Sequence, residues 1–400
     1  MALVLLPAIW LIVFIVGLPQ LSETVYTPSL PEIATGLNTA ESLVEYTLTI
    51  YLFGFAIGTL FWGKISDKFG RKPCIVAGLC IFILGCIGCY NAYSIDILMF
   101  SRFIQAFGGS TGSVLGQAVC RDAFHGPSLG KVYALIGSRL AVFPAIGPMI
   151  GGFITEHFEW YNIFLFLMVV AVLLLIIVIK YLPETHRKAD RQPIALNSVI
   201  QLLTQDKKVI SLGLIVAACN GIMFSYYAEG SFYLIKLLGL APSKYGLSFI
   251  LIAFFTMLGG LTSKQLHSKY SANQIMGFGI VIIAIASALF SLLILGHVIN
   301  FYNLTNLSLI IITILIQTIL MFGVCMVQSN ALATALIDYK WCIGTASSLF
   351  GFYYYCGISF FTFVMGFLHN GTLVPMPLYF FAISLLMLLI KQLILTKAVD

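Results

Sequence analysis

Residues 63–73 read Gly-Lys-Ile-Ser-Asp-Lys-Phe-Gly-Arg-Lys-Pro and separate two long apolar runs. Glycine suits a sharp reversal of the chain, because it adopts backbone conformations that other residues avoid. Asp67 can cap a helix or pair with a cation, and the guanidinium of Arg71 can bind a carboxylate through two parallel hydrogen bonds. The stretch therefore predicts a tight turn between two helices, in which Gly63, Asp67, Gly70 and Arg71 form a charged conformational latch.

The composition around this stretch indicates a membrane protein. Charged residues make up 9% of the 400-residue chain and hydrophobic residues 60%, whereas soluble proteins carry about 25% charged residues. So few polar side chains cannot cover a soluble globule of this size, and the hydrophobic content excludes a disordered chain. A dozen helical spans of about 20 residues each would use about 240 positions and leave only short loops.

The apolar runs predict helices, because transmembrane strands need about 10 residues of alternating polarity. The longest polar stretch, residues 183–208, divides the chain near its middle. We therefore expect an all-α membrane protein with twelve transmembrane helices in two six-helix bundles, residues 1–182 and 209–400, joined by the linker 183–208. The first run lacks the basic start and cleavage site of a signal peptide and is expected to remain as a span. The predicted spans lie near 3–29, 43–62, 74–91, 97–119, 130–154, 160–182, 209–236, 244–263, 274–296, 305–335, 343–367 and 374–396.

Lysine and arginine gather in alternate loops and so predict the orientation. Under the positive-inside rule the loops rich in these residues, the linker and both termini lie in the cytoplasm, with the chain in the inner cell membrane. The cations of the linker are expected to meet anionic lipid headgroups, not nucleic acid. The loop cations are Lys64, Lys68, Arg71, Lys72, Arg121, Lys131, Arg187, Lys188, Arg191, Lys207, Lys208, Lys264, Lys269 and Lys340.

The charged turn has the spacing G-x-x-x-D-[RK]-x-G-R-[RK], which resembles the signature loop of the major facilitator superfamily at every characteristic position. In the fifth predicted span, residues 144–152 read Pro-Ala-Ile-Gly-Pro-Met-Ile-Gly-Gly and resemble the antiporter motif of that superfamily. Glycines let helices approach closely and prolines bend them. A pliable packing seam that biases closure is therefore expected at Pro144, Gly147, Pro148, Gly151 and Gly152.

Other motifs narrow the resemblance to one family. Residues 101–109 resemble the superfamily's motif with a buried arginine. Residues 26–31, Tyr-Thr-Pro-Ser-Leu-Pro, are similar to the Y-x-P-x-L-P of the Bcr/CflA family of drug:proton antiporters, as are residues 329–331 and 344–348. This resemblance implies two bundles, alternating access and export of drugs or metabolites while protons flow inward.

Placing an ionisable side chain at membrane depth costs free energy, so each such residue is a candidate for a functional role. Four stand out in the predicted spans: Glu23, Arg102, Arg139 and Glu229. Glu23, Arg102 and Glu229 are expected at similar depth and are candidates for proton coupling, with Arg102 alternatively a structural cation. Glu23 precedes Thr24, which stands where the family resemblance implies an aspartate. Glu229 either reaches the outer interface or faces the cavity, where a proton and a cationic substrate would compete for it.

Polar and aromatic residues in the spans predict the rest of a substrate site. Asn220 and Tyr227 are seven residues apart and share one helix face. An aromatic, partly polar lining suits flat lipophilic cations or amphipathic molecules, although packing is the competing interpretation for each tyrosine. The candidate substrate-binding residues are Tyr26, Asn220, Tyr227, Gln328, Asn330, Tyr353 and Tyr354.

Motifs of other function classes are missing from the sequence. It has no G-x-x-x-x-G-K-[ST] for nucleotide binding and no H-E-x-x-H or G-x-S-x-G for hydrolysis. The six histidines are scattered, and the nine cysteines lie in or beside apolar runs, where packing explains them. We therefore expect no enzyme, no cofactor and no metal.

The sequence as a whole predicts a monomeric, proton-coupled secondary transporter that exports amphipathic or cationic small molecules by alternating access. Its partners are expected to be the substrate, protons and the lipid bilayer. A dedicated exporter of a single metabolite, such as a siderophore or peptide, is an alternative within the same class. A non-transporting membrane sensor on a transporter scaffold is an alternative from another class.

Overall fold

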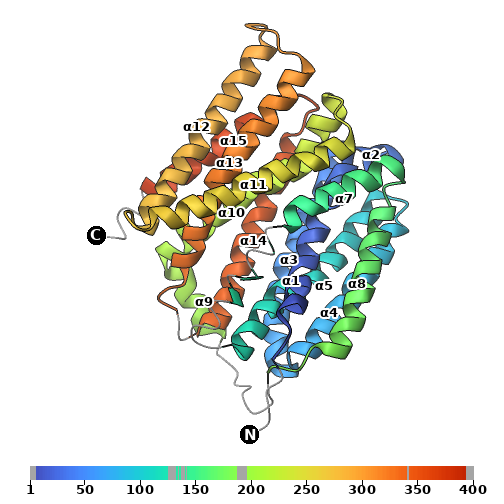
Figure 1. The fold of residues 1–400 in the computed structure, drawn as a ribbon, viewed down its shortest axis with the longest axis vertical. Helices are drawn as coiled ribbons and strands as arrows, with labels where there is room; N and C mark the ends of the chain where they lie inside the picture. Colours follow the sequence, from blue (N-terminus) through green and yellow to red (C-terminus); the bar gives the residue numbers. More distant parts are fainter. Residues whose placement is uncertain are drawn as a thin grey trace.

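The computed structural model describes residues 6–124, 132–133, 135–136, 140, 142–186, 196–339 and 342–392. Every regular element within these residues is a helix. Two bundles of long helices stand side by side, the N-terminal half in blue to green and the C-terminal half in yellow-green to red (Figure 1). The predicted all-helical membrane fold of two bundles is confirmed.

The N-terminal half encloses its own apolar core, which α1, α2, α3, α4, α5 and α8 all help to form. Its first span is longer than predicted, because the chain continues beyond Thr24 through a short 3₁₀ turn into a second helix that ends at Gly36. Pro28 lies at the start of that turn and cannot donate a backbone hydrogen bond, so the regular α-helix is interrupted there. The helices of this half are α1 (Ile9–Thr24), η1 (Thr27–Ser29), α2 (Leu30–Gly36), α3 (Glu41–Phe69), α4 (Arg71–Tyr90), α5 (Ile95–Ala123), α7 (Phe143–His157) and α8 (Asn162–Tyr181).

The C-terminal half encloses a second apolar core. Its first long helix begins at the side chain of Asp206, which accepts hydrogen bonds from the backbone N–H groups of Lys208 and Val209 at 2.8 and 3.2 Å. Such a cap satisfies N–H groups that have no partner within the helix. The helices of this half are α9 (Leu196–Gln205), α10 (Lys207–Ser231), η3 (Phe232–Leu237), α11 (Pro242–Leu266), α12 (Ala272–Val298), α13 (Asn306–Ala335), α14 (Ile343–Leu368) and α15 (Pro375–Ile390).

The charged turn is shorter than the sequence indicated. Helix α3 does not end near residue 62 but continues through the charged stretch to Phe69. Gly70 then reverses the chain with φ of 104°, a conformation that side chains disfavour, and α4 begins at Arg71. A helix can extend past its apolar run in this way, because the charged side chains of its last turns project into water.

The linker also contains a helix that the polar composition did not predict. Within residues 183–208, α9 places Val199 and Leu203 against the core of the C-terminal half. Two apolar residues four positions apart lie on one helix face and provide the contact that orders it.

Among the described residues, nine helices are long and apolar enough to cross a membrane, and α15 is a shorter apolar helix. Two further helices correspond to predicted spans, namely α5 with its buried polar residues and α7, for which 15 residues are described. Arg139, in the fifth predicted span, lies outside the described residues. Below, the linker side means the end of the bundles that carries Gly70 and Glu184, and the His369 side means the opposite end.

Candidate functional site

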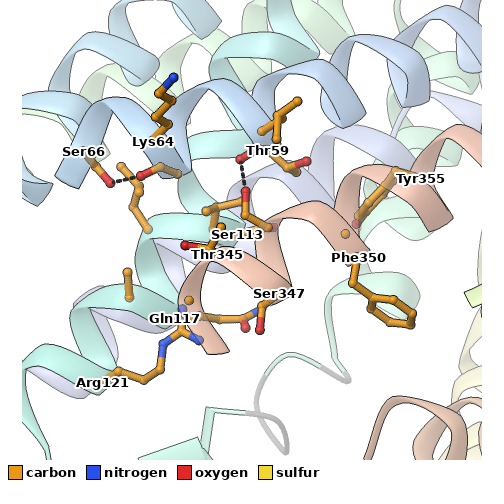
Figure 2. Close-up of a pocket in the computed structure, with 18 of the residues that line it drawn as sticks. Thr59, Lys64, Ser66, Ser113, Gln117, Arg121, Thr345, Ser347, Phe350 and Tyr355 are labelled. Atoms are coloured by element: carbon orange, nitrogen blue, oxygen red, sulfur yellow. Dashed lines mark hydrogen bonds between the residues drawn. The ribbon is translucent and has the colours of Figure 1, made fainter. Parts of the chain in front are cut away.

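A cavity of about 1030 Å³ lies between the two halves. It extends from the linker side to the middle of α14, with α1, α3 and α5 on one wall and α13 and α14 on the other. Figure 2 shows lining side chains from α3, α5 and α14. Its volume is at the upper end of the range for small-molecule sites. Polar and aromatic lining residues include Gln20, Phe55, Thr59, Lys64, Ser113, Gln117, Arg121, Thr345, Ser347, Ser348, Phe350, Tyr354 and Tyr355.

Aromatic rings form the deep end of this cavity. The rings of Phe55 and Tyr355 come from opposite halves and pack with centroids 4.5 Å apart, and Tyr354 lies 4.9 Å from Tyr355. Lys64 and Arg121 lie toward the linker side, at the other end. A deep end of aromatic faces can bind flat or cationic groups, which are attracted to the negative face of a ring.

Several residues that line the cavity were not predicted from the sequence. Gln20 interrupts the apolar first span and was therefore detectable as a polar residue at membrane depth. Ser113 and Gln117 are four residues apart on α5 and so share one face, which now borders the cavity. Both signals are weak in the sequence, because small polar residues also pack between membrane helices.

The predicted substrate-binding residues do not form one lining. Tyr354 borders the cavity. The side-chain amide of Gln328 donates to Asn220 over 3.4 Å and joins α13 to α10. Asn330 donates to Ser263 Oγ over 2.8 Å and fastens α13 to α11. The two hydrogen bonds give these side chains packing roles in this conformation, and substrate binding by them stays a prediction.

Glu23 is 6% exposed and interacts electrostatically with tyrosines of both halves. Among them are Tyr227 of α10 and Tyr354 of α14, two of the predicted substrate-binding residues. The hydroxyl of Tyr353 instead donates to the backbone carbonyl of Ile210, outside the cavity. The carboxylate of Glu23 therefore acts electrostatically on Tyr354 at the aromatic end of the cavity, although Glu23 is not one of the lining residues.

Arg102 is fully buried between two tyrosine rings. Its guanidinium carbon lies 4.4 Å from the ring centroid of Tyr26 and 4.1 Å from that of Tyr51. Nη1 donates to Oε1 of Gln105 over 2.5 Å, whereas Nε and Nη2 have no hydrogen-bond partner. Its attraction to Glu23 acts at longer range, and the described residues contain no ion pair between the two. The aromatic contacts support the structural interpretation, and a role in proton coupling stays a prediction.

Glu229 lies in a different place from Arg102, within a cluster on the His369 side. Its Oε2 is 2.7 Å from Nδ1 of His369, which also lies 3.2 Å from Oε1 of Glu45. Glu229 is fully buried, so it does not reach the outer interface. Burial lowers the pKa of His369, which follows the end of α14, but the hydrogen bond to Glu229 and the nearby carboxylates of Glu229 and Glu45 outweigh burial and raise the pKa to about 10. The sequence gave no sign that Glu45 and His369 would join Glu229, because about 140 or more residues separate them from it.

The residues of the predicted latch belong to a hydrogen-bond network centred on Arg71, and a latching role stays a prediction. The guanidinium donates to Asp67 over 2.6 Å and to Asp122 of α5 over 2.8 Å. The backbone N–H of Arg71 donates to Glu184 over 2.9 Å. The network thereby joins α3, α4, α5 and the segment that follows α8, and Asp122 and Glu184 are members that the motif did not indicate. Gly63 lies one turn before Asp67, beside Ser348 of the C-terminal half.

The small residues of α7 bring three helices close together. A Cβ at Gly147 or Gly151 would overlap α1 or the residue that follows it, and a Cβ at Gly152 would overlap the backbone carbonyl of Pro242 in α11. Pro144 lies in the first turn of α7, and Pro148 lies inside the helix. The motif therefore forms part of the contact between the two halves, as a packing seam requires, while a role in biasing closure stays a prediction.

Comparisons with known proteins agree with this architecture. Residues 9–362 match the sequence model of the Major Facilitator Superfamily. An uncharacterized transporter of Rickettsia bellii (strain RML369-C) is 34% identical over 379 residues, which cover 94% of this chain and 93% of the relative. A bicyclomycin resistance protein homolog of Haemophilus influenzae is 31% identical over 268 residues, which cover 66% of this chain and 67% of the relative. The crystal structure of a D-xylose-proton symporter has a TM-score of 0.76 over 96% of both chains at 13% identity, which shows a shared fold.

Proposed function

This chain belongs to the major facilitator superfamily of membrane transporters, and we propose that it is a proton-coupled antiporter that exports amphipathic or cationic small molecules. The cavity between the halves carries this proposal. It holds about 1030 Å³ and ends at aromatic rings, one of which, Tyr354, interacts electrostatically with the buried carboxylate of Glu23. The resistance protein among its relatives supports export of an antibiotic-like molecule.

Alternating access accounts for movement of the substrate. In this conformation the cavity extends to the linker side, while α7 and α11 and the Glu229 cluster hold the halves together on the His369 side. A substrate entering from the linker side would leave after the halves rock about the cavity and open on the His369 side. The latch at Arg71 and the seam in α7 are proposed to stabilise successive conformations of this cycle.

We assign proton coupling first to Glu23. A buried carboxylate loses its solvation, so it holds a proton unless a cation restores the charged form. A cationic substrate in the aromatic end of the cavity would supply such a charge and displace the proton, and Arg102 would favour the charged form at longer range. Glu229 is the second candidate, at the closed end.

Transport by purified protein in lipid vesicles tests this function. In vesicles with an acidic lumen, uptake of an added lipophilic cation should release protons, and Glu23→Gln should lower this gradient-driven transport at least about tenfold while substrate exchange persists. Glu159→Gln, which replaces an exposed acid in the loop before α8, is the matched control and should behave as wild type. If the transport rate of Glu23→Gln depends on pH as that of wild type does, Glu23 does not take part in proton coupling.

The same assay separates the alternative functions. Transport of one metabolite alone across a broad panel would identify a dedicated exporter, and no transport of any compound would favour a sensor.

We further propose that the linker side faces the cytoplasm, which places both termini there. The support is the loop cations, which include Lys64, Lys68 and Lys72 on this side. A cysteine at exposed Tyr93 should react with an impermeant thiol reagent added to intact cells, whereas a cysteine at exposed Phe69 should not. The reverse labelling pattern would invert the assignment.

A further inference from the structure

Three potential metal ligands from both halves meet on the His369 side. Glu45 comes from α3, Glu229 from α10, and His369 follows α14. One ligand atom from each lies within 4.8 Å of the other two. Both carboxylates are fully buried and the imidazole is 8% exposed.

Three of the four carboxylate oxygens contributed by Glu45 and Glu229 lack a hydrogen-bond partner among the described residues. Nδ1 of His369 faces both acids but carries a single proton, which it shares with Glu229 over 2.7 Å. Both oxygens of Glu45 and Oε1 of Glu229 are buried without a hydrogen bond. Two fully buried carboxyl groups thus face one imidazole, and a buried polar group without a partner is strongly unfavourable.

The other side of the imidazole is arranged as in a metal site. Nε2 of His369 lies 3.2 Å from Oε2 of Glu41, and Glu41 in turn forms an ion pair with Lys236. Histidines that bind metals through one nitrogen usually direct the other N–H to a carboxylate, which fixes the tautomer and the ring orientation. Glu41 would hold His369 with Nδ1 directed at the two unsatisfied acids.

We propose that Glu45, Glu229 and His369 bind a divalent transition-metal ion of the zinc class, and that this ion clamps the His369 side shut. One imidazole nitrogen and two carboxylates are a ligand set for such ions, whereas Mg²⁺ and Ca²⁺ prefer oxygen ligands throughout. The ion replaces the proton on Nδ1, which is released to water, and its two positive charges balance the two carboxylates. Water or a second carboxylate oxygen completes its coordination. Because Glu45 belongs to one half and the other two ligands to the other, opening this side would separate the ligands.

Zinc binding to the purified full chain in detergent tests the site without any transport measurement. Titration with ZnCl₂ against a fluorescent chelator should show a site that MgCl₂ does not fill and that His369→Gln and Glu45→Gln remove. Glu41→Gln, which keeps all three ligands, should weaken zinc binding about 10- to 100-fold. His157→Gln removes an exposed histidine at the end of α7 and should leave this site intact. Equal zinc affinity in wild type, His369→Gln and Glu41→Gln would overturn the proposal.

The clamp has its own readout, which keeps the proposal testable if a ligand variant does not fold. Spin labels at Tyr93 and Phe301, which are 83% and 82% exposed on opposite halves, report the opening of the His369 side. Zinc should remove the longer distances in wild type, and Glu41→Gln should need about 10- to 100-fold more zinc for the same effect. Zinc that binds without changing the distances would refute a clamp between the halves.

Discussion

Replacing Gly152 with alanine should push the protein toward the conformation that opens on the His369 side. The added Cβ would overlap the backbone carbonyl of Pro242 in α11. A carbonyl inside a helix cannot rotate away as a side chain can, so α7 and α11 must separate. Gly246 of α11 should have the same effect when replaced with alanine, because its Cβ would overlap the backbone carbonyl of Pro148 in α7.

The size of the effect follows from where the overlap occurs. Overpacking of a well-packed interface costs about 1–3 kcal/mol. The contact joins the two halves, so this cost falls on the conformation closed at the His369 side and disappears when that side opens. Alanine also favours a helix over glycine by about 1 kcal/mol, but this gain is equal in both conformations and cancels. The ratio of open to closed molecules should therefore rise about 5- to 150-fold.

Distances between spin labels at Tyr93 and Phe301 measure this ratio directly. Gly260→Ala is the matched control, since Gly260 also lies in α11 but its Cβ would meet Sγ of Cys325 at 3.4 Å, an ordinary contact. Gly152→Ala and Gly246→Ala should each enrich the longer distances, and Gly260→Ala should not. Distance distributions identical to wild type in both interface variants would refute the reasoning that α7 and α11 close this side.

Two further predictions concern the buried cations, and both are read from thermal or denaturant unfolding in detergent. Arg102→Lys keeps the charge but loses the planar group stacked between Tyr26 and Tyr51, so it should lower the free energy of unfolding by about 2 kcal/mol, and a wild-type value would show that the stack is not stabilising. Asp122→Asn should cost about 1.5–3 kcal/mol, because this side chain is 19% exposed and accepts a charge-assisted hydrogen bond from Arg71. Asp67→Asn should cost less than about 1 kcal/mol, because Asp67 is 53% exposed, and an equal loss in the two variants would contradict this ranking.

The sequence predicted the fold well because the bilayer imposes a simple rule. A span needs about 20 apolar residues in a helix, so apolar runs and polar breaks show where helices lie. Helix ends were less accurate, as at Phe69 and Gly36, because a helix continues into water beyond its apolar run and a proline turn can lie within a span. The short helix α9 was missed because its order comes from contacts with the apolar core of the C-terminal half.

The candidate site was only partly predictable for a different reason. Rarity within the membrane selected Glu23, Arg102 and Glu229, and the structure places all three in the interior. The sequence did not predict the partners of these residues. Arg102 lies against tyrosine rings, and Glu229 contacts His369 instead of Arg102.

The sequence by itself determined that this chain spans a membrane in two helical bundles and carries a charged turn between two helices, because hydropathy and a short motif are local properties. The tertiary structure alone decided which residues line the cavity and which acids share one histidine. Glu41 and Glu45 lie in the third helix along the chain, and His369 follows the last but one. Only the packing of one half against the other brings such distant residues together, and no spacing in the sequence encodes that contact.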